Sequence, residues 1–586
     1  MRRIVRRRQK QVEAVAEAAE KSLDTNFVGR FDRIVKVRRF ALGWLTLTAL
    51  ATICTVVQTV NLGAYYQTTQ PVPGGTYNEG MVGAYSNANP IFATGAVDVA
   101  ASQLLFAGLF RYDDRNQLVG ELATGYQVDP TGKHYTISLR PGLTWHDGKP
   151  LTAEDVAFTY RLIQNPDVRS PLQASWQGIT VRATDKLTVV FDLPNVYSAF
   201  PHSLLTGIVP KHILSGVPAA QLRSDPFNTV RPVGAGPFMW QALEVKNATD
   251  PDKIVSLVAL QHFSKYASGE PLLSAFVLHA YGSKEEMVTA FHNREINAMT
   301  GLNSIPELLQ DDDSVRATSF ASTAAMMTFF KTTEGALSNA TVRKALVQGA
   351  NTDKVINNLD YVTRPVRSPL LMGQLAYDPA YAQATFNAAG AKAALEADGW
   401  VRGNDGIRTK DGQRLAFRLY AEDTDENQRT VSSLVRDWHF LGAEVTPVLQ
   451  SQTDFQTTVQ FHTYDALLYG ISIGPDPDVY AYWDSKQADI RSTARLNFSE
   501  YQSTVADGAL EAGRTRLDPE LRVVKYKPFL QAWQADAPAL GLYQPRFLYI
   551  TRGTVYGLSD RTLNTDADRY DSVVDWQMRT AKVTNE

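Results

Sequence analysis

One uninterrupted apolar run dominates the hydrophobic pattern of this sequence. Residues 40–60 are twenty-one consecutive residues without a charged side chain. A helix of that length rises about 31 Å, which suffices to cross a hydrocarbon core of about 30 Å. The pattern therefore predicts a single transmembrane helix over residues 40–60.

Charge flanks this run on one side only. Residues 1–39 contain twelve Lys or Arg against five Asp or Glu, and after residue 60 the first charged residue is Glu79. Cytoplasmic flanks of membrane spans are rich in Lys and Arg. We therefore expect a single-pass protein of the cytoplasmic membrane, with a basic cytoplasmic segment at residues 1–39 and the rest of the chain on the extracytoplasmic face.

Three other interpretations of the run stay open. A cleaved signal peptide has a shorter apolar core, of about 7–15 residues, and a small-residue cleavage site, whereas this run offers only weak sites such as residues 49–51. A lipid-modified Cys54 would lie deep inside the run. A buried helix of a globular domain would explain the five Thr and one Gln in the run, but it would not explain the one-sided charge.

Beyond the run, apolar residues alternate or recur at helical spacing in short stretches, which predicts a mixed α/β body. Residues 61–73 contain Pro and lack apolar periodicity, so we expect a linker there. Thr152 and Asp155 have the spacing of a capping box. The expected helices are residues 11–23, 93–108, 152–163, 284–293 and 342–350, and the expected strands are residues 109–112, 134–140, 187–193 and 254–260. Trp145 is expected to be buried beneath the turns that surround it.

Composition limits the possible functions. The 586 residues suggest two or more domains. The formal net charge is −3, and because residues 1–39 carry +7, the remainder carries −10. An acidic body gives no reason to expect nucleic acid as a partner. The single cysteine, Cys54, excludes an intramolecular disulfide and thiolate chemistry outside the span.

Motifs for catalysis and for metal binding are weak. The nine histidines are scattered without a recognisable metal-binding spacing, and no phosphate-binding loop motif occurs. Residues 470–474 match the Gly-x-Ser-x-Gly pattern around Ser472, but a nucleophile elbow needs a helix directly after the serine, and Pro475 disfavours one. We expect no enzymatic activity, no cofactor and no metal site; a serine hydrolase acting through Ser472 is the alternative.

Seven sequence blocks in a fixed order resemble the extracytoplasmic solute-binding proteins, family 5, of peptide and nickel ABC importers. The resemblance covers the chain from about residue 74 onward, and its longest block is the most specific. The blocks are Leu122-Ala123 with Tyr126, then residues 135–156, 208–213, 232–238, 342–346, 475–480 and 536–540.

The resemblance implies an α/β, two-lobed periplasmic-binding-protein-like fold, which here would follow one transmembrane helix. Lobe I would comprise residues 74–275 and 490–586, with an extra subdomain near 93–200, and lobe II residues 276–489. The implied function is that of the substrate-binding subunit of a peptide-type ABC importer, which captures a ligand, expected to be an oligopeptide, between its lobes. The implied partners are a peptide or other small solute, the importer's permease and ATPase subunits, and the membrane through residues 40–60.

The resemblance also suggests ligand-binding residues after the strand that ends near residue 473. In this family such a strand end borders the ligand, which here implicates Tyr469, Ser472, Asp476, Tyr480 and Trp483. Members that bind free peptide N-termini commonly place an acid just before this loop, where the present chain has Ile473. Either Asp476 or another acid takes that role, or the ligand lacks a free amine there.

A second expected cleft segment follows the first strand of the body. It contains Tyr85, Ser86 and Asn87, in an Asn- and Pro-rich loop that has an ordinary structural explanation as well. A surface receptor or chaperone-like binder that keeps the fold without feeding a transporter is the alternative function.

Overall fold

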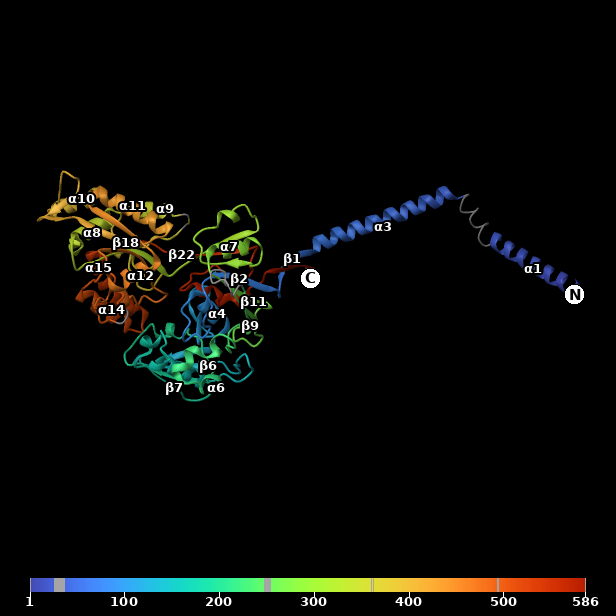
Figure 1. Cartoon of the computed structure of the whole chain (residues 1–586), viewed down its shortest axis with the longest axis horizontal. Coiled ribbons are helices and arrows are strands. Elements are labelled where there is room, and N and C mark those ends of the chain that lie inside the picture. The colour runs from blue at the N-terminus through green and yellow to red at the C-terminus, as the bar shows by residue number, and fades with distance from the viewer. Residues whose placement is uncertain are drawn as a thin grey trace. The chain divides into compact units, whose positions relative to one another are not determined.

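The computed structural model describes residues 2–25, 37–246, 255–359, 361, 363–492 and 495–584. The chain divides into two compact units (Figure 1). The first consists of Met1–Val72 with Thr580–Glu586, and the second of Pro73–Arg579. The second unit is the mixed α/β body that the sequence predicts.

Two long helices and a pair of strands make up the first unit. Helix α1 (Arg2–Leu23) is longer than the helix expected at residues 11–23, and α3 (Arg38–Tyr66) contains the predicted span. Residues 26–36 of the basic segment lie outside the described residues. By length and composition, Arg38–Asn61 is long and apolar enough to cross a membrane, and its described side chains are exposed.

The segment expected to be a linker belongs to two elements of secondary structure instead. Helix α3 continues to Tyr66, and β1 (Gln67–Val72) pairs with β23 (Arg579–Thr584) in a two-stranded sheet. The Pro and Gly residues at 71–75 are typical of a loop, but a strand exists through its partner, and this partner is remote in the sequence. A local pattern therefore misses the pairing.

The larger sheet of the second unit has seven strands in the order β13-β22-β12-β2-β11-β10-β9, and we call the part of the chain folded around it lobe I. Strand β2 is parallel to its neighbours β11 and β12, whereas the outer pairs are antiparallel. Helices α4 (Ala96–Leu105) and α7 (Lys284–His292) contact it. The strands are β2 (Thr76–Val82), β9 (Phe238–Lys246), β10 (Val255–His262), β11 (Ala275–Tyr281), β12 (Ala298–Met299), β13 (Val315–Ala321) and β22 (Arg546–Arg552).

A subdomain inserted into lobe I carries a four-stranded antiparallel sheet and a short hairpin. Trp145 is fully buried there, as predicted, and the Asp155 carboxylate accepts a hydrogen bond of 2.9 Å from the Thr152 N–H, as a capping box requires. Its apolar residues belong to the same core as those of lobe I. The elements are β3 (Phe110–Tyr112), β4 (Leu118–Gly120), β5 (Ala123–Val128), β6 (His134–Leu139), α5 (Ala153–Gln164), β7 (Thr180–Ala183), β8 (Thr188–Asp192) and α6 (Lys211–Leu214).

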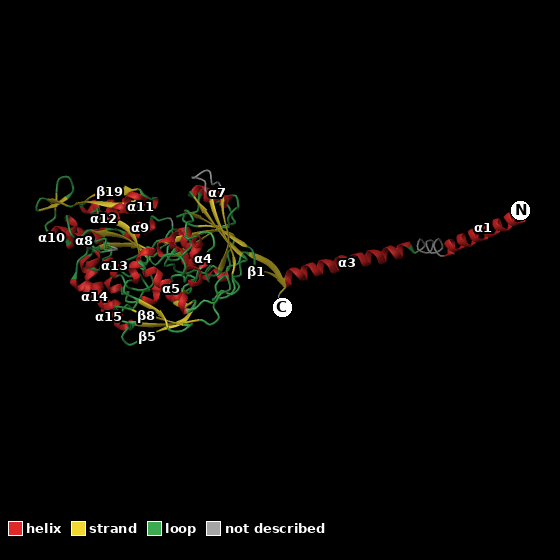
Figure 2. Cartoon of the chain, turned by 60° about the horizontal axis from the view of Figure 1, so that its bottom comes forward, coloured by secondary structure: helices red, strands yellow, loops and turns green. Residues whose placement is uncertain are grey.

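Lobe II is the part of the chain folded around a five-stranded sheet with the order β19-β18-β20-β14-β21. Consecutive residues of β14 point to opposite faces, so that Phe329 joins one apolar core and Phe330 the other. Helices α8 (Ala340–Gly349), α9 (Thr352–Asn357), α11 (Asp425–Leu441) and α12 (Gln452–Phe461) contact the sheet (Figure 2). The strands are β14 (Ala324–Phe330), β18 (Ala416–Glu422), β19 (Glu444–Gln450), β20 (Ala466–Ser472) and β21 (Ala539–Tyr543), and a small sheet adds β15 (Val401–Arg402), β16 (Arg408–Lys410) and β17 (Gln413–Arg414).

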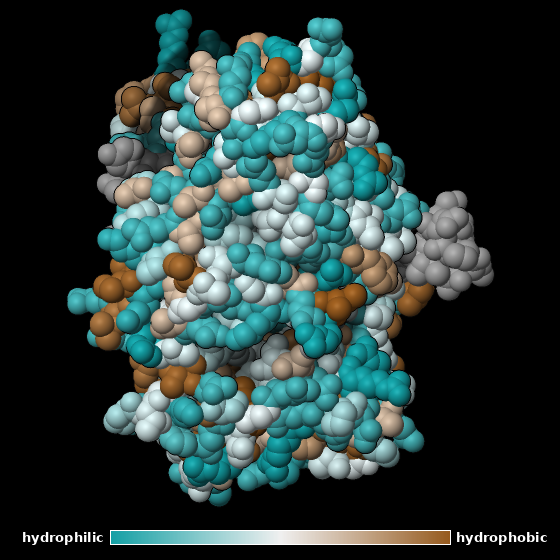
Figure 3. Space-filling view, turned by 90° about the vertical axis from the view of Figure 1, so that its left-hand side faces the viewer, coloured by the Kyte–Doolittle hydropathy of each residue, from teal (hydrophilic) through white to brown (hydrophobic). Residues whose placement is uncertain are grey.

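The helices of lobe II lie on both sides of this sheet, and they form the outer surface of the lobe. They are α8 (Ala340–Gly349), α9 (Thr352–Asn357), α10 (Ala388–Ala397), α11 (Asp425–Leu441), α12 (Gln452–Phe461), α13 (Tyr480–Trp483), α14 (Thr504–Arg514) and α15 (Pro519–Asp536). On the face drawn in Figure 3, hydrophilic side chains predominate, apolar ones are scattered, and a recess crosses the lower part. Such a surface is typical of a face in contact with water.

The chain passes between the lobes at residues 322–323 and 544–545, and these crossings differ from the expected boundaries. Residues 276–321 were assigned to lobe II, but β12 and β13 belong to the sheet of lobe I. Residues 490–543 were assigned to lobe I, but α14, α15 and β21 belong to lobe II. The reason is long-range pairing: residues 315–321 pair with 546–552, and no local signal in the sequence reveals such a ladder.

A buried ion pair, hydrogen-bonded to two tyrosines, lies at the centre of lobe I. Glu79 of β2 and Arg569 are 0% and 1% exposed, and they form an ion pair. The Glu79 carboxylate also accepts hydrogen bonds from the hydroxyls of Tyr549 (2.7 Å) and Tyr570 (2.8 Å). Burial raises the pKa of both hydroxyls well above the ordinary value, which keeps them protonated as donors. The Glu79 carboxylate is therefore stabilised in the core by the Arg569 charge and by two tyrosine hydroxyls.

Replacing Arg569 by methionine should destabilise the protein strongly, because Glu79 would remain as a buried charge without its cation. Breaking a buried pair in this way costs about 3–5 kcal/mol. Urea unfolding followed by tryptophan fluorescence measures the loss. The matched control is Arg414→Gln, which breaks exposed pairs with Asp405 and Glu444 and should change the urea midpoint far less, because exposed pairs contribute little. Equal midpoints for R569M and R414Q would contradict this account of the cluster.

Candidate functional site

A cavity of about 640 Å³ lies where the subdomain, lobe II and the two crossing segments meet. Its volume is typical of pockets for small-molecule ligands, about 300–1,000 Å³. Both lobes contribute to its wall, which makes it the candidate site. The lining residues come from the β3–β4 turn (115–118), the crossing segments (Thr323, Gln544) and the loops 371–375 and 474–477, together with Tyr126, Ser198, Pro201, His202, Arg364, Leu517, Pro519, Arg522 and Thr562.

The loop after β20 supplies one wall of the cavity. Gly474 has a φ of +74°, a left-handed conformation that favours glycine, and the prolines at 475 and 477 restrict the backbone that follows. The N–H groups of Ile473 and Gly474 donate to the carbonyl of Thr323, at 2.9 and 3.1 Å. The loop is thus hydrogen-bonded to a crossing segment.

Asp476 lies on this loop and is paired with an arginine of α15. Two nitrogens of the Arg522 guanidinium donate to the two carboxylate oxygens, at 2.7 and 2.8 Å, and the Asp478 N–H donates to one of them at 2.9 Å. Burial opposes the charge of Arg522, but the contacts with Asp476 raise its pKa above the ordinary value. Such forked pairs are strong and directional. Both oxygens of Asp476 are therefore engaged within the protein.

Arg514, at the end of α14, connects lobe II to the subdomain. Its guanidinium lies 3.1 Å from the Asp478 carboxylate and 4.2 Å from the ring centre of Tyr480, and it also covers the ring of Tyr197 at 5.1 Å. The Arg514 carbonyl accepts hydrogen bonds from the N–H (2.9 Å) and the hydroxyl (3.0 Å) of Ser198. These contacts span the two lobes beside the cavity.

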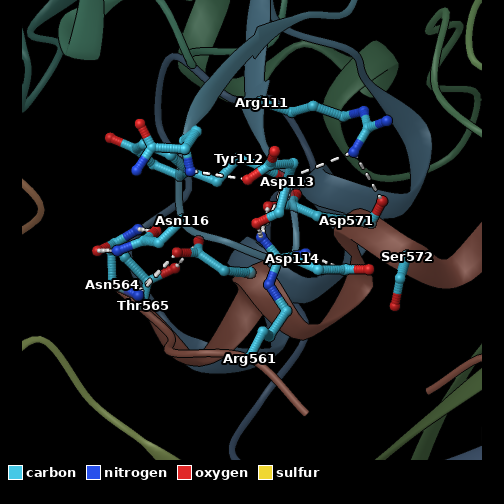
Figure 4. Close-up of polar contacts among 12 residues, drawn as sticks. Arg111, Tyr112, Asp113, Asp114, Asn116, Arg561, Asn564, Thr565, Asp571 and Ser572 are labelled. Carbon is cyan, nitrogen blue, oxygen red and sulfur yellow. Dashed lines mark hydrogen bonds and ion pairs between the residues drawn. The ribbon is translucent and has the colours of Figure 1, made fainter. Parts of the chain in front are cut away.

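A pair of asparagines joins the β3–β4 turn to the segment around residue 564, which in turn contacts the crossing residue Thr323 (Figure 4). Asn116, with a φ of 58°, and Asn564 exchange amide hydrogen bonds of 3.1 and 2.7 Å. The Thr323 hydroxyl donates to the Asn564 side-chain oxygen at 2.9 Å, and the Thr323 N–H donates to the Leu563 carbonyl at 2.8 Å. The turn and the crossing segment are thereby held in one network.

A buried arginine, Arg561, also contacts the β3–β4 hairpin (Figure 4). Arg561, 1% exposed, donates to the carbonyls of Tyr112 (3.0 Å) and Asp113 (3.1 Å) and to the Asp571 carboxylate (3.1 Å). The Asp113 carboxylate accepts from the N–H groups of Arg115 (2.9 Å) and residue 117 (2.8 Å). The turn that presents Arg115 to the cavity is therefore firmly held.

The residues expected at the end of β20 have different environments. Asp476 lines the cavity, and Tyr480 lies beneath the Arg514 guanidinium. The Ser472 carbonyl accepts a hydrogen bond of 2.7 Å from Tyr482. Tyr469 packs against Phe455 and Phe498, and Trp483, 0% exposed, packs against Phe329 and Trp533. In this structure Trp483 is a core residue of lobe II.

The second expected segment lies within lobe I and forms its own network. The Asp98 carboxylate accepts hydrogen bonds from the N–H (2.7 Å) and hydroxyl (2.5 Å) of Ser86 and from the N–H of Asn87 (3.0 Å). Tyr85 stacks on Trp240 with ring centres 6.0 Å apart. None of these three residues is among those that line the cavity.

The sequence-based reasoning missed the arginines of the cavity, namely Arg115, Arg364 and Arg522. Arg115 belongs to a turn that the sequence marked only as a strand end, and Arg522 is 46 positions from its partner Asp476. No sequence motif marks Arg364 as a cavity residue. Its backbone is positioned by a residue that is remote in the sequence, since the Gln544 N–H donates to the Arg364 carbonyl at 2.9 Å.

The geometry around Ser472 lacks the elements of a nucleophile elbow. Strand β20 ends at Ser472, and the next helix, α13, begins at Tyr480 rather than directly after the serine. Among the described residues, no group of three or more His, Cys, Asp or Glu side chains is placed to hold a metal ion. The arrangement suits noncovalent binding in a cavity between two lobes.

Comparison with known proteins agrees with this architecture. The chain is 23% identical over 525 residues to the oligopeptide-binding protein AppA of Bacillus subtilis, an alignment that covers 87% of this chain and 94% of that protein. The structure of AppA with a nonapeptide matches with a TM-score of 0.68 and 21% identity, covering 87% of this chain and 100% of that one. NikZ of Campylobacter jejuni in complex with Ni(L-His) matches with a TM-score of 0.71 and 22% identity, covering 86% and 99%.

These structural neighbours are two-lobed α/β binding proteins, so the predicted fold class is confirmed for the body of the chain. A family model for bacterial extracellular solute-binding proteins, family 5 (middle), matches residues 117–491. Its members bind solutes and are not enzymes, as the absence of an intact nucleophile elbow led us to expect. Because the match covers more than half of the sequence, this chain belongs to the bacterial extracellular solute-binding proteins of family 5.

Proposed function

We propose that this protein is the membrane-anchored substrate-binding subunit of a peptide-type ABC importer. It would capture a peptide or peptide-sized solute between its lobes and deliver it to a permease that an ATPase powers. The observation that carries this proposal is the cavity of about 640 Å³ whose wall both lobes share. Two similar proteins described above, one in complex with a nonapeptide and one with Ni(L-His), support a peptide or another small solute as the ligand.

The two crossing segments are suited to act as a hinge. They lie against each other, since the Ser322 N–H donates to the Pro545 carbonyl at 3.3 Å and the Gln544 side-chain amide donates to the Ser322 carbonyl at 3.1 Å. A ligand that contacts both lobes binds the closed form better than the open one, and it therefore increases the population of the closed form. The Arg514 contacts with Tyr197 and Ser198 would form as the lobes close.

Helix α3 is the proposed anchor. The basic residues before it and the uncharged segment after it support an orientation with the N-terminus in the cytoplasm and the binding body on the extracytoplasmic face. The body would then bind its solute at the extracytoplasmic face of the membrane, which is also the face from which a permease would receive it.

The threonines of α3 fit a lipid environment better than their polarity suggests. Each hydroxyl donates to a carbonyl one turn earlier, at 2.5 to 2.8 Å, so that no hydroxyl proton is left without an acceptor. A satisfied hydroxyl costs much less to place in an apolar medium than an unsatisfied one. The threonines concerned are Thr46, Thr48, Thr52, Thr55 and Thr59.

The full chain, purified in detergent, should bind short peptides or retain a bound solute. A ligand at one hundred times its Kd stabilises a protein by about 2.7 kcal/mol, which raises the melting temperature by a few degrees. Native mass spectrometry with ligand release identifies a retained solute, and thermal melting against a peptide pool detects binding. A protein that is empty and shows no shift with any peptide in the pool would contradict the importer proposal.

Replacing Leu50 and Ile53 together by arginine should prevent stable membrane insertion. Each arginine near the helix centre costs about 2.5–3.5 kcal/mol of insertion free energy. Extraction of membranes with alkaline carbonate measures the loss: the unaltered chain should stay in the membrane pellet and L50R/I53R should be released. The control, Val12→Arg in α1, should behave like the unaltered chain. Release of the unaltered chain by carbonate would refute the anchor.

A further inference from the structure

The charges that line the cavity are unequal. Three arginines, Arg115, Arg364 and Arg522, line it, and Asp476 is the one carboxylate among the described lining residues. Because Asp476 and Arg522 neutralise each other through two hydrogen bonds, two positive charges remain. Neither Arg115 nor Arg364 forms a side-chain ion pair with another described residue, and both are exposed. The described lining of the cavity is therefore net basic.

These two arginines approach the cavity from different lobes. Arg115 lies on the β3–β4 turn, which the Arg561 and Asn564 contacts hold in place. Arg364 lies in lobe II, where its carbonyl accepts from the Gln544 N–H at 2.9 Å. Each backbone is thus fixed, while neither guanidinium is paired with a carboxylate of the described residues; this arrangement suits capture of a carboxylate by a forked pair of hydrogen bonds.

The same cavity offers little to an ammonium group. A buried ammonium needs a carboxylate partner, and both oxygens of Asp476 are already used by Arg522. Ile473, before the loop, is apolar and 7% exposed. The other polar lining groups are amides, hydroxyls and His202, and burial lowers the pKa of His202, so its ring is neutral near pH 7. No described lining residue is therefore a free anion.

We propose that the cavity selects a solute of net negative charge, such as a short acidic peptide, whose carboxylates are bound by Arg115 from the subdomain and Arg364 from lobe II. The inference rests on the proposed solute-binding function and specifies its ligand class. It also explains how such a ligand closes the protein, because a molecule that bridges the two arginines contacts both lobes and binds only when they are near each other.

Isothermal titration with matched tripeptides, at low ionic strength, tests this proposal on the full chain in detergent. The probes are triglutamate, triglutamine and trilysine, each with a free or an acetylated N-terminus and with a free or an amidated C-terminus. A hydrogen-bonded charge contributes about 1.5–3 kcal/mol, so triglutamate should bind at least about tenfold more tightly than triglutamine. Acetylation should change this affinity little, and comparison of the amidated forms separates side-chain from terminal carboxylates.

Variants assign the preference to the two arginines. Arg115→Gln and Arg364→Gln should each weaken triglutamate binding by about tenfold or more, and they should weaken binding of C-terminally amidated triglutamine, which has no carboxylate, much less. Arg364→Glu should shift the preference toward trilysine. The matched control is Arg516→Gln, an exposed arginine outside the lining, which should bind triglutamate normally. Because Arg115 and Arg364 are exposed, melting temperatures of these variants should match that of the unaltered chain.

The outcomes separate this inference from the proposed function. If triglutamine binds as tightly as triglutamate, or if the arginine variants bind triglutamate normally, the anionic ligand class is wrong and solute binding stands. If acetylation abolishes binding, an ammonium contact dominates and the inference is wrong. If neither the tripeptides nor a peptide pool binds, both the inference and the importer proposal are overturned.

Discussion

The backbone of Thr323 is the point at which the parts of the binding body are joined. Its N–H donates to the Leu563 carbonyl of lobe I, and its carbonyl accepts from the N–H groups of Ile473 and Gly474 in lobe II. Its side chain reaches Asn564, which pairs with the subdomain turn. One residue of a crossing segment therefore contacts three parts of the chain that line the cavity, namely the 474–477 loop, the segment at 562–564 and, through Asn564, the β3–β4 turn.

This constraint explains why the 474–477 loop, which is the part of the lobe II wall that carries Asp476, offers a ligand no unpaired carboxylate. The 474–477 loop is held by Thr323 at its start and by the Asp476–Arg522 pair at its tip, so the carboxylate stabilises the protein rather than a ligand. Removing either partner would leave a poorly hydrated charge, which is strongly unfavourable. Among the described lining residues, the charged side chains without an ion-pair partner are those of Arg115 and Arg364, and both are exposed.

Local features of the sequence predicted local structure well. The capping box at Thr152 and the periodicity of residues 284–293 produced helices at those places, and Trp145 was recognised as a core residue. The lobe boundaries failed because they depend on the β13–β22 ladder, which joins residues more than two hundred positions apart. The partner of Asp476 was missed for the same reason. The sequence shows that a polar residue such as Asp476 follows a strand. It does not show which remote residue, here Arg522, the fold brings into contact with it.

The strand pair β1–β23 changes how the body is connected to α3, the proposed anchor. A single Pro- and Gly-containing linker would leave the connection flexible. In the structure, the segments that leave the body at Pro73 and at Arg579 both continue into strands of one sheet. Two hydrogen-bonded strands bend and extend less freely than one irregular segment, because each strand restrains the other. In the anchored protein that we propose, this second strand would reduce the volume that the body searches above the membrane, which would raise its effective concentration at the proposed permease.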